Sequence, residues 1–252
     1  DAVLAIEKRI INNYKKNQKF SIICGNGNNG ADGILLSCKL MLRNYKIKAY
    51  YISEVGSPEF NHQFNYAKKI ELNLEEIDFD NLKSIEFSGV IIDCIFGVGL
   101  NREIKGKYLK LINLVNSLKK KIISIDTPSG ISADTYFSSS HIISNKVLTF
   151  HVPKLTFFFS EYIDKIKNVE ILDIGLDNSE YKRMEGVGEL IDINIIAKKY
   201  KPRKKTIHKG DCGHALLFAG SEGKYGASIL CGKSLFRTGA GLLTFLSDEK
   251  TK

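Results

Sequence analysis

A glycine-rich segment, Gly25–Gly33 (Gly-Asn-Gly-Asn-Asn-Gly-Ala-Asp-Gly), separates two apolar stretches near the start of the chain. The stretch before it, Ser21–Cys24, predicts a short strand, and apolar residues return at helical spacing from Ile34 to about Asn44. A strand, a glycine-rich turn and a helix make the first unit of a doubly wound sheet. The segment therefore favours an α/β fold with this loop at the carboxyl edge of a parallel sheet.

The chain continues to alternate between strand and helix patterns. A helical pattern, Asp1 to about Lys16, precedes the first strand, and Val90–Ile95 is apolar on both faces, which is typical of a strand covered on both sides. Strands separated by helices imply right-handed crossovers, so we expect a mostly parallel, Rossmann-like three-layer sandwich. The other predicted elements are strands at Lys46–Ile52, Lys121–Ile125, Lys146–Phe150 and Val169–Ile174, and helices at Pro58–Ile70 and Lys107–Leu118.

Composition changes near Lys198. Residues 198–209 are basic, include a proline and lack apolar periodicity, so they predict a linker between a first domain over 1–197 and a second pattern. That second pattern, over 210–252, consists of a strand at His214–Ala219, a helix at Ala227–Arg237 and a strand at Leu242–Leu246. So few residues cannot enclose a core, and we expect an incomplete α/β domain there.

The net charge of +9, from 37 basic and 28 acidic residues, raises the question of nucleic-acid binding. Most of the basic residues are lysines spread along the chain, without interleaved aromatics, and part of the excess lies in the linker. Because arginine is preferred for bidentate phosphate and base contacts, we expect no nucleic-acid partner. No apolar run approaches the roughly 18 residues of a membrane span, so no membrane association is expected either.

The five cysteines are an odd number and contain no CxxC pair. Four of them lie in apolar stretches, which indicates buried, reduced thiols. Reduced thiols are typical of a cytoplasmic protein, and we expect that location.

The glycine-rich segment has several interpretations. Gly25, Gly27 and Gly30 match the dinucleotide-binding fingerprint, and Glu54, near the end of the second strand, could contact a ribose. The same glycines could instead serve a tight turn with close packing of strand and helix. The segment also carries four polar side chains, those of Asn26, Asn28, Asn29 and Asp32. Backbone amides bind phosphate without side-chain amides, so these side chains indicate further polar recognition or cation binding.

Two carboxylates follow later strands of the predicted sheet. Asp93 lies near the end of a strand and precedes the loop 97–103, and Asp126 ends the next strand. Because the carboxyl ends of parallel strands share one edge, we expect these loops to converge with Gly25–Gly33. Either aspartate alone could be a helix cap or turn residue. A carboxylate in a cleft is also the usual candidate for acid–base chemistry.

Asn29, Asp93 and Ser129 could supply hard oxygen ligands, which suit an alkali or alkaline-earth cation. No His/Cys cluster has the spacing of a zinc site, and the isolated histidines His62, His141 and His151 are interpreted as surface or core side chains. Lys154, which follows Val-Pro, is interpreted as a turn lysine in preference to a phosphate contact.

Four ordered motifs resemble the NAD(P)H-hydrate epimerase family, the YjeF N-terminal domain. They are Gly25–Gly33, Asp93–Leu100, Asp126–Asp134 and Thr149–Lys154, and the resemblance runs over about Asp1–Leu176. It implies that NADH or NADPH hydrated at C6 of the nicotinamide ring (NADHX or NADPHX) binds at the sheet edge. The R and S forms of this hydrate would be interconverted there, as a step in cofactor repair.

The later segment resembles the opening of the ADP/ATP-dependent NAD(P)H-hydrate dehydratase, a ribokinase-like domain. The motifs are His208–His214, Ala219–Ser221, Tyr225–Ala227 and Arg237–Leu242, and the order of the two parts is that of the bifunctional bacterial enzyme. This resemblance implies ADP or ATP as the dehydratase co-substrate and Ala227 as a dehydratase substrate contact. It also implies that the catalytic end of that domain is missing from this chain.

The epimerase resemblance implies roles for individual residues. Asp126 contacts the hydrate and is the expected acid–base residue, and a potassium ion is expected at Asn29, Asp93 and Ser129. The other expected substrate contacts are Asn28, Asn29, Gly30, Ala31, Asp32, Gly97, Val98, Gly99, Leu100, Asn101, Arg102 and Glu103. Family members resemble dimers, which leaves a homo-oligomer open.

The chain departs from the family pattern at a few points. Ala31 stands where the family usually has glycine, which requires a negative φ at this position. Thr127 replaces a usual aliphatic residue, and the family's N-terminal arm is expected to be missing. Two other classes stay open, an NAD(P)-binding oxidoreductase with a Rossmann-type site and a non-catalytic nucleotide-binding module. The oxidoreductase would leave the asparagines and the two aspartate loops without a role.

Overall fold

Two units make up the chain, residues 1–187 and residues 188–252. The computed structural model describes residues 1–177, 188, 190–200 and 202–247. Residues 178–187 and 189 of the expected first domain, residue 201 of the expected linker and residues 248–252 of the expected second domain lie outside the described residues.

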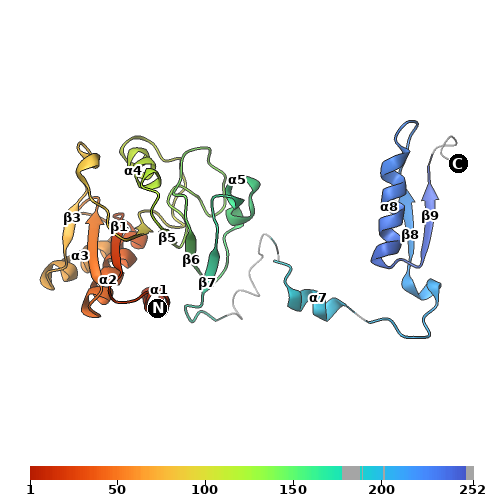
Figure 1. Ribbon diagram of the computed structural model, residues 1–252, viewed down its shortest axis with the longest axis horizontal. Coiled ribbons are helices and arrows are strands. Elements are labelled where there is room, and N and C mark those ends of the chain that lie inside the picture. The colour runs from red at the N-terminus through yellow and green to blue at the C-terminus, as the bar shows by residue number, and fades with distance from the viewer. Residues whose placement is uncertain (178–187, 189, 201, 248–252) are drawn as a thin grey trace. The chain divides into compact units, whose positions relative to one another are not determined.

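A seven-stranded sheet forms the centre of the first unit, and all neighbouring strands are parallel (Figure 1). Its order is β3-β2-β1-β4-β5-β6-β7. The strands are β1 Lys19–Cys24, β2 Lys46–Tyr51, β3 Leu74–Glu76, β4 Val90–Cys94, β5 Ile122–Ile125, β6 Lys146–Phe150 and β7 Val169–Leu172. This arrangement confirms the predicted doubly wound, parallel α/β fold.

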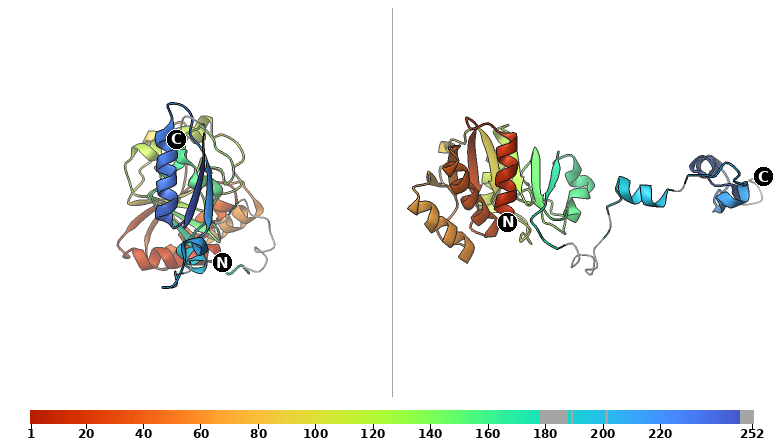
Figure 2. Two further views of the ribbon diagram at one scale, coloured as in Figure 1. Left: turned by 90° about the vertical axis from the view of Figure 1, so that its right-hand side faces the viewer. Right: turned by 90° about the horizontal axis from the view of Figure 1, so that it is seen from below.

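Helices cover both faces of this sheet and give three layers, as Figure 2 shows from a second direction. One face packs against α1 (Ala2–Asn13), α2 (Asn28–Leu42) and α3 (Pro58–Lys69), and the other against α4 (Gly106–Ser117). Ile22 and Ile23 of β1 belong to opposite hydrophobic clusters, because successive strand side chains point to opposite faces. The short helices of this unit are η1 Leu82–Ser84, η2 Leu155–Phe158 and α5 Ser160–Ile163.

The strand order reverses between β1 and β4. From β1 the chain builds outward through β2 and β3, then crosses to the other side of β1 to form β4. The helices that leave these two neighbouring strands diverge, which opens a crevice outside their carboxyl ends. The glycine-rich segment and the loop after Asp93 both start at this crevice.

The structure corrects the predicted start of α2. The helix begins at Asn28 and not after Gly33, so most of the glycine-rich segment is the first helical turns. Glycine has low helix propensity, but packing against the sheet overrides propensity here. The three-residue strand β3 and the short helices η1, η2 and α5 were not predicted, because segments of three or four residues show no periodicity.

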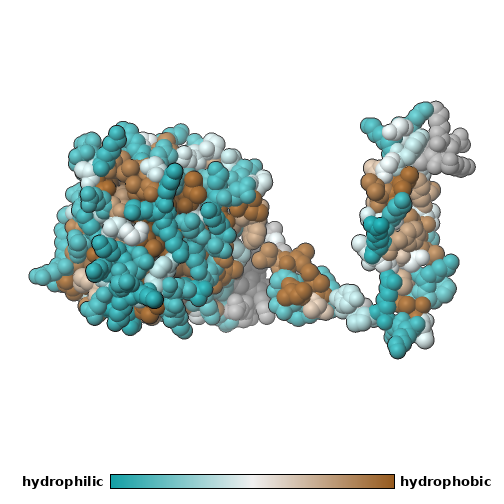
Figure 3. Space-filling view, in the orientation of Figure 1, coloured by the Kyte–Doolittle hydropathy of each residue, from teal (hydrophilic) through white to brown (hydrophobic). Residues whose placement is uncertain are grey.

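The second unit contains one parallel strand pair, β8 (His214–Phe218) with β9 (Leu242–Leu246), joined by helix α8 (Tyr225–Thr238). These elements were predicted, whereas α7 (Ile193–Lys199) was not, and it takes in the first two residues of the expected linker. A 3-10 helix, η3 (Lys209–Cys212), precedes β8. Large apolar side chains are exposed in this unit, as the brown surface in Figure 3 shows; Phe218 is 83% exposed.

The described cysteines are all free, and three of them, Cys24, Cys38 and Cys94, are buried. Burial raises the pKa of the Cys38 thiol to about 11, so this thiol stays protonated and unreactive. Cys231 is exposed. Among the described residues, no helix is long and apolar enough to cross a bilayer.

Close packing of α2 on the sheet generates a stability prediction at Gly30. A Cβ at this position would lie 1.7 Å from the carbonyl oxygen of Gly25, whereas a Cβ at Gly27 would meet no described heavy atom within 4 Å. We expect Gly30→Ala to lower the free energy of unfolding by about 3 kcal/mol or more, because backbone must move.

The matched control is Gly27→Ala, in the same segment, where loss of the glycine N-cap should cost under about 1 kcal/mol. Urea unfolding of both variants in the full chain measures the difference. Equal stabilities would show that the Gly25–Gly30 contact does not constrain the fold.

Candidate active site

A cavity of about 530 Å³ lies at the carboxyl ends of the central strands. Its size is within the range of small-molecule sites, which run from about 300 to 1,000 Å³. Three chain segments that the sequence predicted to converge meet here: the start of α2, the loop after β4 and Asp126 after β5. The lining residues are Ala2, Asn26, Gly27, Asn28, Asn29, Asp32, Ile95, Phe96, Gly97, Val98, Gly99, Leu100, Asn101, Arg102, Asp126 and Phe150.

The N-terminus of α2 opens onto this cavity. Gly27 is the N-cap, no side chain caps the helix, and Asn28 and Asn29 form its first turn. Unpaired N–H groups and the helix dipole favour an anion at such an end. Arg102, from the loop after β4, adds a positive side chain to the lining. The cavity is therefore suited to a ligand that carries phosphate.

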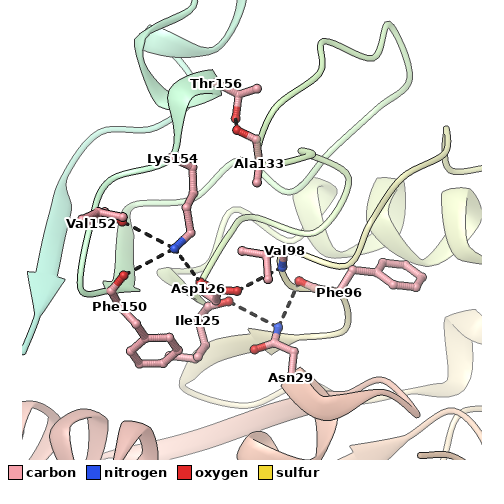
Figure 4. A network of polar contacts seen from close by, with 10 residues as sticks. All are labelled: Asn29, Phe96, Val98, Ile125, Asp126, Ala133, Phe150, Val152, Lys154 and Thr156. Carbon is pink, nitrogen blue, oxygen red and sulfur yellow. Dashed lines mark hydrogen bonds and ion pairs between the residues drawn. The ribbon is translucent and has the colours of Figure 1, made fainter. Parts of the chain in front are cut away.

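Asp126 is held in an unusual backbone conformation at the end of β5. Its φ is +66°, in the left-handed region that non-glycine residues seldom adopt, and the residue is 8% exposed. The backbone N–H of Asp126 donates to the Leu148 carbonyl at 2.8 Å. Figure 4 shows the contact of its side chain, in which Oδ2 accepts from the Val98 N–H at 3.0 Å. Strained residues persist where their surroundings fix them, frequently at active sites.

Lys154 is part of this site, which corrects its interpretation as a turn lysine. Its Nζ lies 3.3 Å from Asp126 Oδ1 and 3.4 Å from the carbonyl oxygens of Phe150 and Val152 (Figure 4). The lysine follows β6, so its strand end shares the edge with those of β4 and β5. The rule that predicted convergence for Asp93 and Asp126 would also have found Lys154.

Asp93, near the end of β4, is completely buried and is not among the residues that line the cavity. Its Oδ1 accepts from Ser129 Oγ at 2.5 Å and the Ile95 N–H at 3.2 Å, and its Oδ2 accepts from Ser124 Oγ at 2.8 Å and the Ser129 N–H at 2.9 Å. Burial raises the pKa of Asp93, whereas these hydrogen bonds oppose the shift. The carboxylate ties β4 to β5 and to the loop after β5.

Asn29 presents an unused acceptor next to these groups. Its Nδ2 donates to the carbonyl oxygens of Phe96 at 3.0 Å and Ile125 at 3.3 Å, while its buried Oδ1 has no hydrogen-bond partner among the described residues. A buried acceptor without a partner is costly, and a hard cation is one group that would satisfy it. The free Oδ1 of Asn29 therefore fits the expected alkali cation, whereas each Asp93 oxygen already accepts two hydrogen bonds. No group of three or more His, Cys, Asp or Glu side chains with metal-site geometry was found in the described residues.

Asp32 gives the cavity a second carboxylate. Burial raises its pKa to about 6, and the nearby charge of Asp126 adds to the shift. Asp32 lies in the second turn of α2. A carboxyl group that titrates near neutral pH in a cavity is a candidate for proton exchange with a ligand.

Some expected contacts do not line the cavity. Gly30 and Ala31 are buried within α2, where Ala31 has the negative φ that its side chain needs. Glu103 Oε1 accepts from Ser138 Oγ at 3.0 Å, outside the lining. Glu54 pairs with Lys68 at 3.0 Å and is likewise not a lining residue, and Ala227 is exposed on α8 of the second unit.

The raised pKa of Asp32 predicts a pH-dependent cost in stability. The pKa of Asp32 is about 6 in the folded chain, above its usual value of 3.8. The charged carboxylate therefore lowers the free energy of unfolding, by nothing below pH 3.8, increasingly up to about pH 6, and by its full amount above that. We expect Asp32→Asn to raise the free energy of unfolding by about 1–2 kcal/mol at pH 7.5, discounted for partial exposure.

Thermal unfolding at pH 7.5 and pH 4.5 tests this expectation, and the gain should shrink at the lower pH. The exposed Asp80→Asn is the matched control and should change little at either pH. A gain of equal size at both pH values would contradict the assignment to the Asp32 charge.

Comparisons with known proteins agree with this geometry. Residues 2–156 match the family model described as YjeF-related protein N-terminus. Among curated proteins, the chain is 34% identical to the bifunctional NAD(P)H-hydrate repair enzyme Nnr of Dictyoglomus turgidum, over 93% of this chain and 46% of that protein. It is 28% identical to the NAD(P)H-hydrate epimerase of Levilactobacillus brevis, over 72% of this chain and 86% of that protein.

The chain spans about half the length of the bifunctional relatives it matches. A solved structure, that of yeast ynu0, superimposes with a TM-score of 0.51 at 21% identity and covers 61% of this chain and 68% of its own. This likeness supports the fold. The family model extends over more than half of the sequence, and the chain belongs to the YjeF-related N-terminal family.

Proposed function

We propose that the first unit is an NAD(P)H-hydrate epimerase, which interconverts the R and S forms of the hydrated cofactor at C6 of the nicotinamide ring. The observation that carries this proposal is the position of Asp126. Its largely buried carboxylate lines a cavity at the carboxyl edge of the sheet, where the strand order reverses. The names of the relatives from Dictyoglomus and Levilactobacillus support the same reaction.

The cavity offers complementary groups for such a substrate. The N-terminus of α2 and Arg102 would receive phosphate, while Asn28 and Asp32 would hydrogen-bond polar atoms of the hydrate. Asp126 would hold or move a proton at the C6 hydroxyl, because a carboxylate fixed by the Val98 N–H needs little reorganisation. The loop 97–102 lines the cavity and would lie against the ring.

A potassium ion is part of this proposal. Asn29, through its unpartnered Oδ1, and Ser129 would hold it, with Asp93 as the buried counter-charge. When bound, such an ion supplies fixed positive charge near the site at which negative charge develops. Both Asp93 oxygens already accept hydrogen bonds, including one from the Ser129 hydroxyl, so we assign Asp93 the role of orienting Ser129.

ADP or ATP would serve the dehydratase part of the bifunctional relatives. In the described part of the second unit, Ala227 is exposed on α8, and an apolar pocket is lined by Ile191, Ile195, Ile196, Lys199 and Tyr200. These residues do not form a nucleotide site by themselves. We therefore derive no dehydration step from this chain.

An oxidoreductase would use an acidic residue after β2 to bind the cofactor ribose. Glu54 has that place in the sequence, yet it pairs with Lys68 and does not line the described cavity. The site thus supports the epimerase over the dehydrogenase. Three buried free thiols also agree with the proposed cytoplasmic location.

A coupled assay tests the proposed reaction. Equilibrated NADHX is mixed with the purified chain, a separate S-specific dehydratase and ADP, and the R form is followed over time. We expect the R form to be consumed faster than it epimerises spontaneously. Persistence of the R form at the spontaneous rate would refute the proposal and favour a non-catalytic nucleotide-binding module.

Asp126→Asn should lower the rate of epimerisation by about 100-fold or more, because it removes the group that accepts the proton. Asp164→Asn, an exposed aspartate at the end of α5, is the matched control and should retain full activity. Circular dichroism and thermal unfolding check that both variants fold. Undiminished activity of Asp126→Asn would remove Asp126 from the acid–base role.

Potassium should stabilise the folded chain relative to tetramethylammonium at equal ionic strength. At a potassium concentration ten times the Kd of the site, binding would add about 1.4 kcal/mol to the free energy of unfolding. Thermal unfolding in the two chloride salts measures this effect, and Asn29→Ala should abolish it. Identical melting temperatures of the unaltered chain in both salts would reject the cation site.

A further inference from the structure

The ammonium group of Lys154 is largely buried and is surrounded by oxygen acceptors. Its side chain is only 14% exposed, and its ammonium has three donors for three acceptors: the carbonyl oxygens of Phe150 and Val152, and Asp126 Oδ1. Lysine ammonium groups usually reach solvent, and burying one requires paired partners. The chain thus places a satisfied cation directly behind the Asp126 carboxylate.

The two oxygens of Asp126 are held from opposite sides. Oδ2 accepts from the Val98 N–H in the loop after β4, and Oδ1 faces Lys154 in the loop after β6 (Figure 4). Asp126 itself ends β5, the strand between these two. The pair of contacts therefore fixes the plane of the carboxylate across three neighbouring strand ends.

Lys154 does not itself line the described cavity, whereas Asp126 and Phe150 do. Its ammonium contacts Asp126, and the Asp126 side chain separates it from the cavity. The other charged side chains in the lining are Asp32 and Arg102. Lys154 is thus the cation paired with Asp126, while Arg102 belongs to the lining that meets the ligand.

We propose that Lys154 is a positioning residue, which holds the Asp126 carboxylate in the orientation that meets the substrate without touching the substrate itself. This inference rests on the proposed epimerase function. A misplacement of about 1 Å at a reacting group can lower a rate by about 100-fold. Loss of the ammonium should therefore affect turnover and leave substrate binding nearly unchanged.

The test compares Lys154→Met, which keeps the length of the side chain, with Lys154→Arg, which keeps the charge. Lys110→Met, an exposed lysine on α4, is the matched control. We expect Lys154→Met to lower kcat of epimerisation by about 10- to 100-fold with KM within about threefold. Lys154→Arg should restore kcat to within about fivefold of the unaltered chain.

Crystal structures of Lys154→Met and Lys154→Arg give a readout without turnover. The carboxylate of Asp126 should keep its orientation in Lys154→Arg and rotate or become disordered in Lys154→Met. An unchanged carboxylate in Lys154→Met, or a kcat within twofold of the unaltered chain, would overturn the proposal. A raised KM at unchanged kcat would also overturn it, in favour of direct substrate binding by Lys154.

The outcome for the unaltered chain separates the two proposals. If the unaltered chain epimerises NADHX and Lys154→Met does so equally well, the positioning role alone fails. If the unaltered chain shows only the spontaneous rate, the epimerase proposal fails and the role of Lys154 fails with it.

Discussion

A completely buried carboxylate, that of Asp93, organises the edge of the sheet at which the site is built. It accepts two hydrogen bonds from Ser129 and others from Ser124 and the Ile95 N–H. A buried charge is tolerated only when such bonds satisfy it. The hydrogen bonds to Asp93 therefore fix the loop after β4 and the loop after β5 relative to β4. The loop after β4 then presents the Val98 N–H to Asp126, and the start of α2 contributes further lining of the cavity.

Much of this arrangement could be predicted from the sequence. Alternating strand and helix patterns predict the parallel sheet, and polar residues at three strand ends predict that these ends meet, which the lining of the cavity confirms. In a parallel sheet, residues that follow different strands lie close together because the carboxyl ends of all strands share one edge. The start of α2 was predicted wrongly, because glycine and asparagine at Gly25–Gly33 look like a turn until the packing of the helix on β1 and β4 is known.

Other features depend on three-dimensional contacts that no local pattern shows. The left-handed backbone of Asp126, the unpartnered Oδ1 of Asn29 and the pairing of Lys154 with Asp126 each involve several segments at once. The motif predicts ligand contacts at Gly30 and Ala31, and the structure shows both residues buried in α2, where their small size allows close packing. The packing of these small residues on the sheet is therefore a structural role that the motif alone does not show.

The central claim is that this chain exchanges the two C6 configurations of the hydrated cofactor. The direct measurement starts from the separated S epimer of NADHX and follows the appearance of the R epimer by chromatography, without any dehydratase. We predict that catalytic amounts of the chain bring the mixture to the same final ratio as the spontaneous reaction, at a rate proportional to the amount of chain. A rate independent of the amount of chain would contradict the account.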